Sequence, residues 1–240
     1  MHLTMNPISN IGDSIYFGLR KQIIELNLKP GEPLVIKEIA QKLEVSRSPV
    51  RDSIIKLSKE GLVDILAQRG TYVSKIDLKR VEEEQFIRSS LEEKAILLFM
   101  KQYNEYSIIQ LENLIEMQIT SLKNQDYTSF LDYDDAFHSI FFKTAERDMS
   151  WNLIESISGH YRRLRLITLW DLETSEEVIR QHRQIIQYIK EKNVDMILQS
   201  THQHFTRIVS QTDYIVEKYP TYFKQKSDEN FLSKNFGQYV

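Results

Sequence analysis

Residues 46–57 read SRSPVRDSIIKL, and this stretch decides how the N-terminal part of the chain folds. Ser46 is a residue type favoured at a helix N-cap, and Pro49 falls in the first turn, where its missing N–H group costs nothing. Arg47 and Arg51 lie one turn apart, on the side away from the apolar residues. The residues expected to face a core are Val50, Ser53, Ile54 and Leu57. The stretch therefore predicts an amphipathic helix whose leading end is basic.

Other short elements surround this helix. A Pro30-Gly31 turn signal ends the preceding helical pattern, residues 44–46 form a tight turn into the basic helix, and Gly61 supplies a left-handed stop. Helices are expected at 15–26, 36–43 and 46–60, and the strands of a small hairpin at 62–66 and 71–74. This order of elements predicts a winged helix-turn-helix domain.

A helix-turn-helix places its second helix in the major groove of DNA. Arg47 and Arg51 suit bidentate contacts with guanine, while Ser46 and Ser48 suit phosphates at the helix N-terminus. Arg69 at the tip of the wing and Lys37 are further candidates for groove or phosphate contacts. The alternative is that both arginines are solvated charges, which is the more common outcome for an isolated SRxxxR string. The surrounding order of elements favours DNA binding.

The stretch from Ile15 to Val73 resembles the winged helix-turn-helix of the GntR family of bacterial transcription regulators. The motifs that carry the resemblance are LKPG (28–31), IAQKL (39–43), VSRSPVR (45–51), LSKEGLV (57–63) and RGTYV (69–73). One departure is that Val35-Ile36 stands where the second helix would have a polar N-cap. The DNA-contacting positions that the resemblance implies are Lys37, Ser46, Arg47, Ser48, Arg51, Gln68 and Arg69.

The composition of the whole chain narrows the class of protein. The 240 residues include no cysteine, which excludes disulfides, thiolate zinc sites and cysteine nucleophiles. No apolar run is long enough to span a membrane and the N-terminus does not resemble a secretion signal, so a cytoplasmic location is expected. Residues 1–76 hold 11 Lys/Arg against 8 Asp/Glu, whereas the whole chain has a net charge of −3. Only the N-terminal domain is therefore expected to meet a polyanion.

The rest of the chain has a helical pattern almost throughout, so the fold class is mainly α. Six helices are expected, at about 78–102, 105–123, 126–146, 149–172, 174–191 and 193–219. Residues 220–240 mix aromatic and polar residues without a clear period. The expected organisation is a DNA-binding domain at 1–76, an all-α bundle at 77–219 and a loosely held tail at 220–240.

The helical patterns of the bundle place several polar side chains on apolar faces. Asp134 and His138 lie one turn apart beside the stripe of Phe130, Phe137 and Phe141, and His182 and His204 fall within the stripes of their own helices. A buried, unpaired carboxylate would cost several kcal/mol, which a divalent cation would offset. These four residues are a reasonable ligand set for Zn²⁺, Ni²⁺ or Mn²⁺. The alternative is that each histidine is a core residue bonded to a separate neighbour.

The bundle resembles the FCD effector-binding domain of the FadR-type subgroup of the same family, in its VanR-like six-helix variant. The resemblance rests on Asp134-x-x-x-His138, on His182 and His204 spaced 22 residues apart, and on the RSSLE string at 88–92. It implies that Asp134, His138, His182 and His204 form a metal site. Arg88, which borders an apolar stripe, and His160 are candidate contacts for a carboxylate effector, and His160 has the alternative of bonding a neighbour.

Together these features predict a ligand-responsive transcription regulator, a repressor or an activator, rather than an enzyme. A homodimer would bring two DNA-binding domains to a palindromic operator in double-stranded DNA, and a small organic acid would bind at the metal. One alternative is a metal-dependent helical hydrolase carrying a DNA-binding domain, but the His-Asp, Glu-x-x-His and His-Glu-x-x-His motifs of such enzymes are absent from the sequence. The other alternative is a regulator whose metal is purely structural.

Overall fold

The computed structural model describes residues 11–225 of the chain, which divide into two compact units. The first unit, called the head, comprises residues 11–78 together with 216–225. The second comprises residues 79–215 and is called the sensor, after the effector-binding role predicted from its sequence. No described helix is both long and apolar enough to cross a bilayer.

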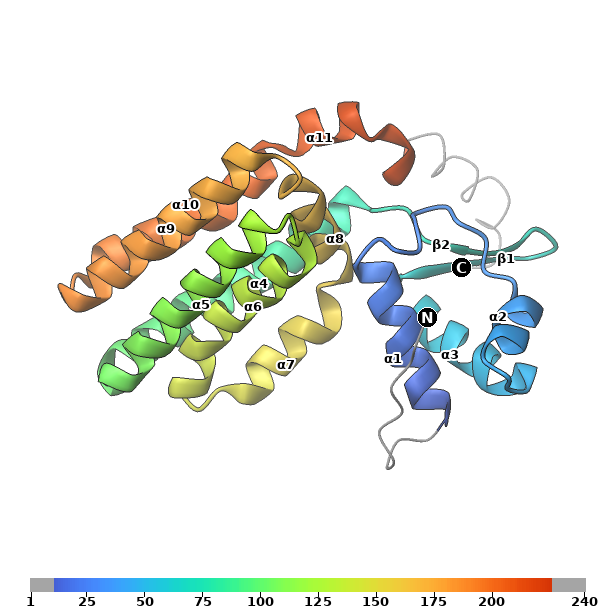
Figure 1. The fold of residues 1–240 in the computed structure, drawn as a ribbon, viewed down its shortest axis with the longest axis horizontal. Helices are drawn as coiled ribbons and strands as arrows, with labels where there is room; N and C mark the ends of the chain where they lie inside the picture. The colour runs from blue at the N-terminus through green and yellow to red at the C-terminus, as the bar shows by residue number, and fades with distance from the viewer. Residues whose placement is uncertain (1–10, 226–240) are drawn as a thin grey trace. The chain divides into compact units, whose positions relative to one another are not determined.

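The head contains three helices and a two-stranded wing, which confirms the predicted winged helix-turn-helix (Figure 1). The elements are α1 (Ile11–Ile24), α2 (Ile36–Lys42), α3 (Arg47–Lys59), β1 (Val63–Leu66) and β2 (Gly70–Val73). The strands are antiparallel, with Val63 opposite Val73 and Leu66 opposite Gly70. All four residues of α3 that were expected to face the core are buried, and the three apolar ones pack with Ile15, Leu19 and Ile23 of α1.

Two tight connections fix the position of α3. The amide of Val45 donates to the carbonyl of Ala40 at 3.0 Å, which closes the turn between α2 and α3. Ser46 is the N-cap residue of α3, as expected, but its side chain makes no capping hydrogen bond. Gly61 follows α3 with φ of 75°, and the amide of Leu62 donates to the carbonyl of Leu57 at 2.9 Å. This is the left-handed helix stop predicted from the glycine.

The end of the described chain belongs to the head. After α11 (Thr212–Lys218) and the short 3-10 turn η1 (Pro220–Tyr222), residues 220–224 form a segment that we call the clasp. The amide of Ile76 donates to the carbonyl of Tyr222 at 2.8 Å, and the amide of Lys224 donates to the carbonyl of Ile76 at 2.9 Å. Phe223 and Ile76 are both fully buried, and Lys224 pairs with Asp77 at 3.0 Å.

The clasp differs from the loosely held tail expected at 220–240. Residues 220–225 are anchored because a large aromatic side chain is buried and because they pair the backbone groups of Ile76. The remaining part of that expected tail, 226–240, lies outside the described residues.

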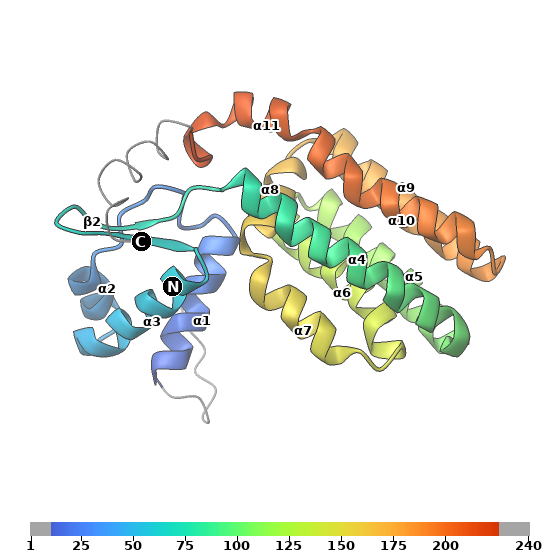
Figure 2. The same cartoon turned by 180° about the vertical axis from the view of Figure 1, so that it is seen from behind.

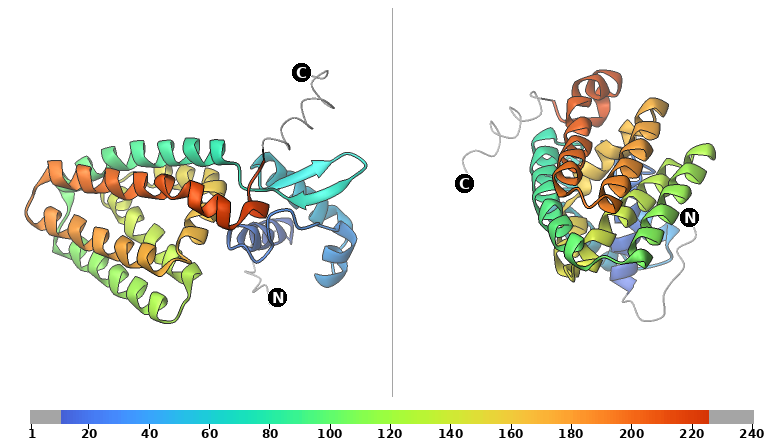
Figure 3. Two further views of the ribbon diagram at one scale, coloured as in Figure 1. Left: turned by 90° about the horizontal axis from the view of Figure 1, so that it is seen from above. Right: turned by 90° about the vertical axis from the view of Figure 1, so that its left-hand side faces the viewer.

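The sensor is all-helical, as predicted. Its helices are α4 (Leu78–Gln102), α5 (Glu105–Lys123), α6 (Tyr127–Thr144), α7 (Asp148–Ile157), α8 (Gly159–Thr168), α9 (Leu172–Lys190) and α10 (Val194–Ser210). Figures 2 and 3 show its long helices lying side by side along one direction. Asn104, Asp126 and Asp171 cap α5, α6 and α9 by accepting a backbone N–H bond. The interior is lined with aromatic and branched apolar side chains, including Phe99, Phe130 and Ile185.

Two of the predicted helices are each broken in two. The predicted helix 149–172 is interrupted at Ser158, between α7 and α8, and the predicted helix 193–219 is interrupted at Gln211, between α10 and α11. The first break has a clear physical cause. The carboxylate of Glu84 in α4 accepts the amides of His160 at 2.9 Å and Tyr161 at 2.8 Å, so it caps a new helix N-terminus at α8.

Candidate metal centre and nucleic-acid interface

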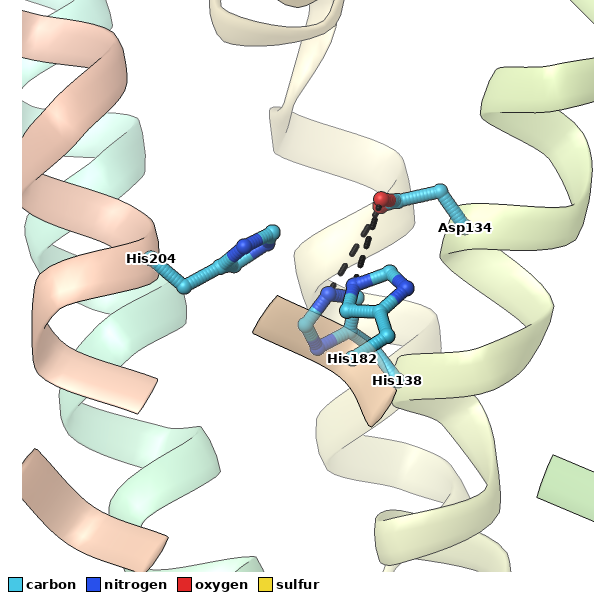
Figure 4. Close-up of side chains that lie close together, drawn as sticks. All are labelled: Asp134, His138, His182 and His204. Atoms are coloured by element: carbon cyan, nitrogen blue, oxygen red, sulfur yellow. Dashed lines mark ion pairs between the residues drawn. The ribbon is translucent and has the colours of Figure 1, made fainter. Parts of the chain in front are cut away.

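The four side chains predicted as metal ligands come together inside the sensor. Asp134 and His138 project from α6, His182 from α9 and His204 from α10, and each offers a ligand atom within 4.8 Å of the others. All four are buried. Figure 4 shows His204 pointing toward Asp134 and His138 from the opposite helix. The first two ligands are one helical turn apart, so a single helix positions both.

Each histidine of the cluster is held by a second side chain at Nδ1. His138 bonds to Glu92, His182 to the Oε1 atom of Gln118 at 2.9 Å, and His204 to the Oε1 atom of Gln181 at 2.9 Å. A carbonyl oxygen can only accept, so Nδ1 of His182 and His204 carries the proton and their Nε2 atoms present lone pairs. Metal-bound histidines typically show this outer hydrogen bond.

The Nε2 atoms face the interior of the cluster. Those of His138 and His182 are buried and have no hydrogen-bond partner, and each lies 3.6 Å from an oxygen of Asp134. Buried polar atoms are rarely left unpaired, because their desolvation costs about 1–3 kcal/mol. If each histidine were only a core residue bonded to a separate neighbour, the hydrogen bonds at Nδ1 would be explained, but the unpaired Nε2 atoms of His138 and His182 would not. One carboxylate and three imidazole nitrogens are a donor set that fits a divalent cation.

The electrostatic state of the cluster suits metal binding. Burial lowers the pKa of His182 to about 3 and also lowers the pKa values of His138 and His204, so the three imidazoles are neutral at pH 7. Burial alone would raise the pKa of Asp134, but the neighbouring Arg165 guanidinium holds it well below its usual range. Metal ligands must be deprotonated, and these four groups already are.

An arginine-rich network adjoins the cluster, and sequence analysis identified only one of its members. Arg88 of α4 pairs with Asp135 at 2.8 Å, in addition to ion pairs at 3.9 Å with Glu92 and Asp134. Arg165 pairs with Asp134 and, at 2.7 Å, with Asp135. Arg162 also pairs with Asp135 and with the more exposed Asp132. The sequence feature that could have identified Arg162 and Arg165 is the string RRLRL (162–166), in which charged residues interrupt the apolar pattern of a helix.

His160 lies outside the four-residue cluster. Its Nδ1 atom is 3.1 Å from Nη2 of Arg163, which donates, and its backbone amide bonds to Glu84. Bonding to a neighbour was the alternative that the sequence left open for this residue.

The residues predicted to contact DNA share one property, which is exposure on the head. They lie in α2, at the start of α3 and in the turn of the wing, namely Lys37, Ser46, Arg47, Ser48, Arg51, Gln68 and Arg69. The hydroxyl of Tyr72 donates to the carbonyl of Arg69 at 2.7 Å and so steadies the wing turn. The Ser46 hydroxyl, which takes no part in the cap of α3, is available for an external acceptor.

Comparisons with known proteins assign each of the two units, the head and the sensor, to a known domain family. Residues 11–73 match the model of the bacterial regulatory proteins of the gntR family, and residues 85–207 match that of the FCD domain. The HTH-type transcriptional repressor RspR of Escherichia coli K12 is 29% identical over 222 residues, which cover 92% of this chain and 97% of that protein. The gluconate operon transcriptional repressor of Bacillus subtilis is 27% identical, covering 82% of this chain and 83% of that one.

Solved structures show the same fold. E. coli McbR/YncC superposes with a TM-score of 0.72 at 17% identity, covering 88% of this chain and 100% of that one. A GntR regulator from Rhodococcus sp. RHA1 superposes with a TM-score of 0.69 at 18% identity, covering 83% of this chain and 97% of that one. The chain therefore belongs to the GntR family of bacterial transcription regulators, which are DNA-binding proteins rather than enzymes, and its sensor is an FCD domain.

Proposed function

We propose that this regulator senses a small organic acid at a divalent metal ion and reads a palindromic operator as a homodimer. The metal, which we take to be Zn²⁺, Ni²⁺ or Mn²⁺, would be held by Asp134, His138, His182 and His204. The observation that carries this proposal is the pair of buried, unbonded Nε2 atoms aimed at a carboxylate, with Nδ1 occupied by hydrogen bonds. When bound, the ion supplies a Lewis-acidic centre for an oxygen donor of the effector.

Arg88 is the residue we assign to the effector's carboxylate. Its guanidinium lies 3.9 Å from Asp134 and is fully buried, which strengthens its attraction for an anion. His160 was the other candidate, but Arg163 and Glu84 already engage it, so we give it a structural role at the start of α8.

The head would read DNA through α3 and the wing. Arg47 and Arg51 would contact base edges in the major groove, and Ser46 and Ser48 would contact phosphates near the N-terminus of the same helix. Lys37, Gln68 and Arg69 would contact the backbone or the minor groove. Binding of the acid would change operator affinity by a coupling of about 1–3 kcal/mol, the range typical of such switches.

The test combines metal analysis with operator binding. Elemental analysis of the purified chain is expected to show one divalent ion per protomer, and His182→Ala to lose it. His202→Ala is the matched control. His202 lies in α10, the helix that also carries His204 of the cluster, but its side chain is 66% exposed. Operator binding is then titrated with candidate acids before and after chelation. If the metal is bound but no acid changes the affinity for operator DNA, this result would favour the alternative in which the metal is purely structural.

A further inference from the structure

One face of α5 is exposed and carries no charged residue. We call its members the α5 stripe, and they are Tyr106, Ile109, Asn113, Met117 and Thr120. At 3.6 residues per turn, all five lie within about 40° of the direction of Asn113. Tyr106 is 66% exposed, Ile109 46% and Met117 47%, and no other described helix exposes three large apolar side chains. In a chain with 27% charged residues, an uncharged and partly apolar stripe of about four turns indicates a surface that another molecule covers.

The described part of the sensor does not cover this stripe. Within the sensor α5 packs against α6 and α9, and Figure 3 shows α5 at the margin of the bundle. Grooves run along both sides of α5, one toward α6 and the other toward α9. The charges beside the stripe are already paired within the sensor, Glu112 with Lys190 at 2.6 Å and Glu116 with Arg183 at 3.8 Å. A helix that stands between two grooves can receive the side chains of a second helix lying along it.

The stripe is symmetric about its central residue, Asn113. Ile109 and Met117 each lie four residues from it. Tyr106 and Thr120 each lie seven residues from it. A two-fold axis through Asn113 therefore lays two copies of α5 antiparallel, with Ile109 of one copy against Met117 of the partner subunit. Asn113 then meets its own counterpart, and a polar pair at the centre of an apolar helix contact fixes the register.

The charges at the ends of α5 favour the same arrangement. Glu105 lies in the first turn of the helix and Lys123 in the last. They are 18 residues apart, which is five full turns, so both point to the same side of the helix. An antiparallel copy brings Glu105 next to Lys123 of the partner subunit at both ends of the contact, whereas a parallel copy would bring like charges together. The helix dipoles of an antiparallel pair also place opposite ends together.

We propose that α5 is the surface through which two copies of this chain associate, antiparallel about a two-fold axis at Asn113. This inference rests on the homodimer of the proposed function and deepens it by naming the surface and its register. The contact extends over about 21 Å of each helix. Removal of Ile109 and Met117 from water stabilises the pair, and Asn113 together with the terminal charges sets the alignment.

The absence of cysteine from the chain allows a direct test by cross-linking. Asn113→Cys places one thiol at the proposed axis of the full-length protein. A short bismaleimide is expected to convert most of this variant into a covalent dimer on a denaturing gel. Met149→Cys, at a side chain 84% exposed on α7, is the matched control and is expected to give no more than a small fraction of cross-linked dimer.

Sedimentation velocity then measures the strength of association. The unchanged protein is expected to be a dimer, and Ile109→Glu to raise its dissociation constant about 100-fold or more, because a charge would be buried against Met117 of the partner subunit. Met117→Lys is expected to have a similar effect. The combined variant Ile109→Glu/Met117→Lys should recover the dimer, because each introduced carboxylate faces an introduced ammonium across the axis. Residues 109 and 117 are two turns apart within one helix, so this recovery cannot arise inside one copy.

The outcomes separate this inference from the proposed function. A dimer that survives Ile109→Glu, or that cross-links no better through Asn113→Cys than through Met149→Cys, would overturn the α5 surface and leave the homodimer intact. Dissociation by both single variants without recovery in the combined one would overturn the antiparallel register. A protein that sediments as a monomer at every concentration would overturn the homodimer itself, and with it this surface.

Discussion

Replacing Arg165 by methionine removes the closer of the two arginines that pair with Asp134, the other being Arg88 at 3.9 Å. In the structure Arg165 is the closest cationic group to this carboxylate, and both side chains are about 95% buried. Removing one partner of a buried ion pair leaves an uncompensated charge and typically costs about 3–5 kcal/mol. We expect a loss of this size in the free energy of unfolding of the chelator-treated protein. The other partner of Arg165, Asp135, retains Arg88 and Arg162 and should contribute little.

Zinc should offset this loss because the ion supplies the missing positive charge at Asp134. By linkage, any stability that zinc restores to the Arg165→Met variant must appear as tighter zinc binding by the variant than by the unchanged protein. A restored stability of about 3 kcal/mol corresponds to an affinity for zinc that is about 100-fold higher. Urea unfolding of the sensor is measured with chelator and with saturating zinc, and zinc affinity is measured by competition with a chelator. Arg162→Met is the matched control, since Arg162 pairs with Asp132 and Asp135 but not with Asp134. Equal losses with and without zinc would refute the idea that the ion and Arg165 share Asp134.

Three further predictions concern other parts of the molecule. Gln118→Leu should weaken zinc binding about 10–100-fold by freeing the ring of His182, and chelator competition showing unchanged affinity would contradict the role of the outer hydrogen bond. Burial raises the pKa of Glu84 to about 7, so between about pH 5 and 7 the folded protein holds a proton that the unfolded chain has released. Its unfolding free energy should therefore fall by about 3 kcal/mol as the pH rises through this window, a fall that urea titrations should not find in Glu84→Gln. In the head, Arg47→Ala should reduce the ratio of operator to non-operator binding, whereas Lys37→Ala should weaken both alike; fluorescence anisotropy with an unchanged ratio for the arginine variant would show that α3 is not the reading helix.

Much of the head could be predicted because its signals are local. The periodicity of 46–57 fixed which residues of α3 face the core, and the structure buries all four of them. The Gly61 stop and the turn of the wing have equally short sequence patterns. The candidate ligands were found for a similar reason: Asp134 and His138 are one helical turn apart, and a polar residue within an apolar stripe is visible in one helix at a time.

The features that sequence analysis missed depend on distant partners. Glu84 breaks the predicted helix 149–172 from 76 residues away along the chain, and no pattern near Ser158 marks it as a partner. Gln118 and Gln181 resemble ordinary surface amides until packing places them against imidazoles. Arg165 resembles a solvated charge for the same reason, although it is almost completely buried. Tertiary contacts, rather than local propensity, determine these roles.

The clasp has a consequence for the order in which this protein can be completed on the ribosome. The domain that is synthesised first includes residues that are synthesised after the whole sensor, because Phe223 and Lys224 pair with Ile76 and Asp77. A nascent or prematurely terminated chain ending before Tyr222 leaves the amide and carbonyl of Ile76 without these partners and its side chain without Phe223. A chimera that exchanges the sensor at residue 78 alone would likewise separate the head from its clasp.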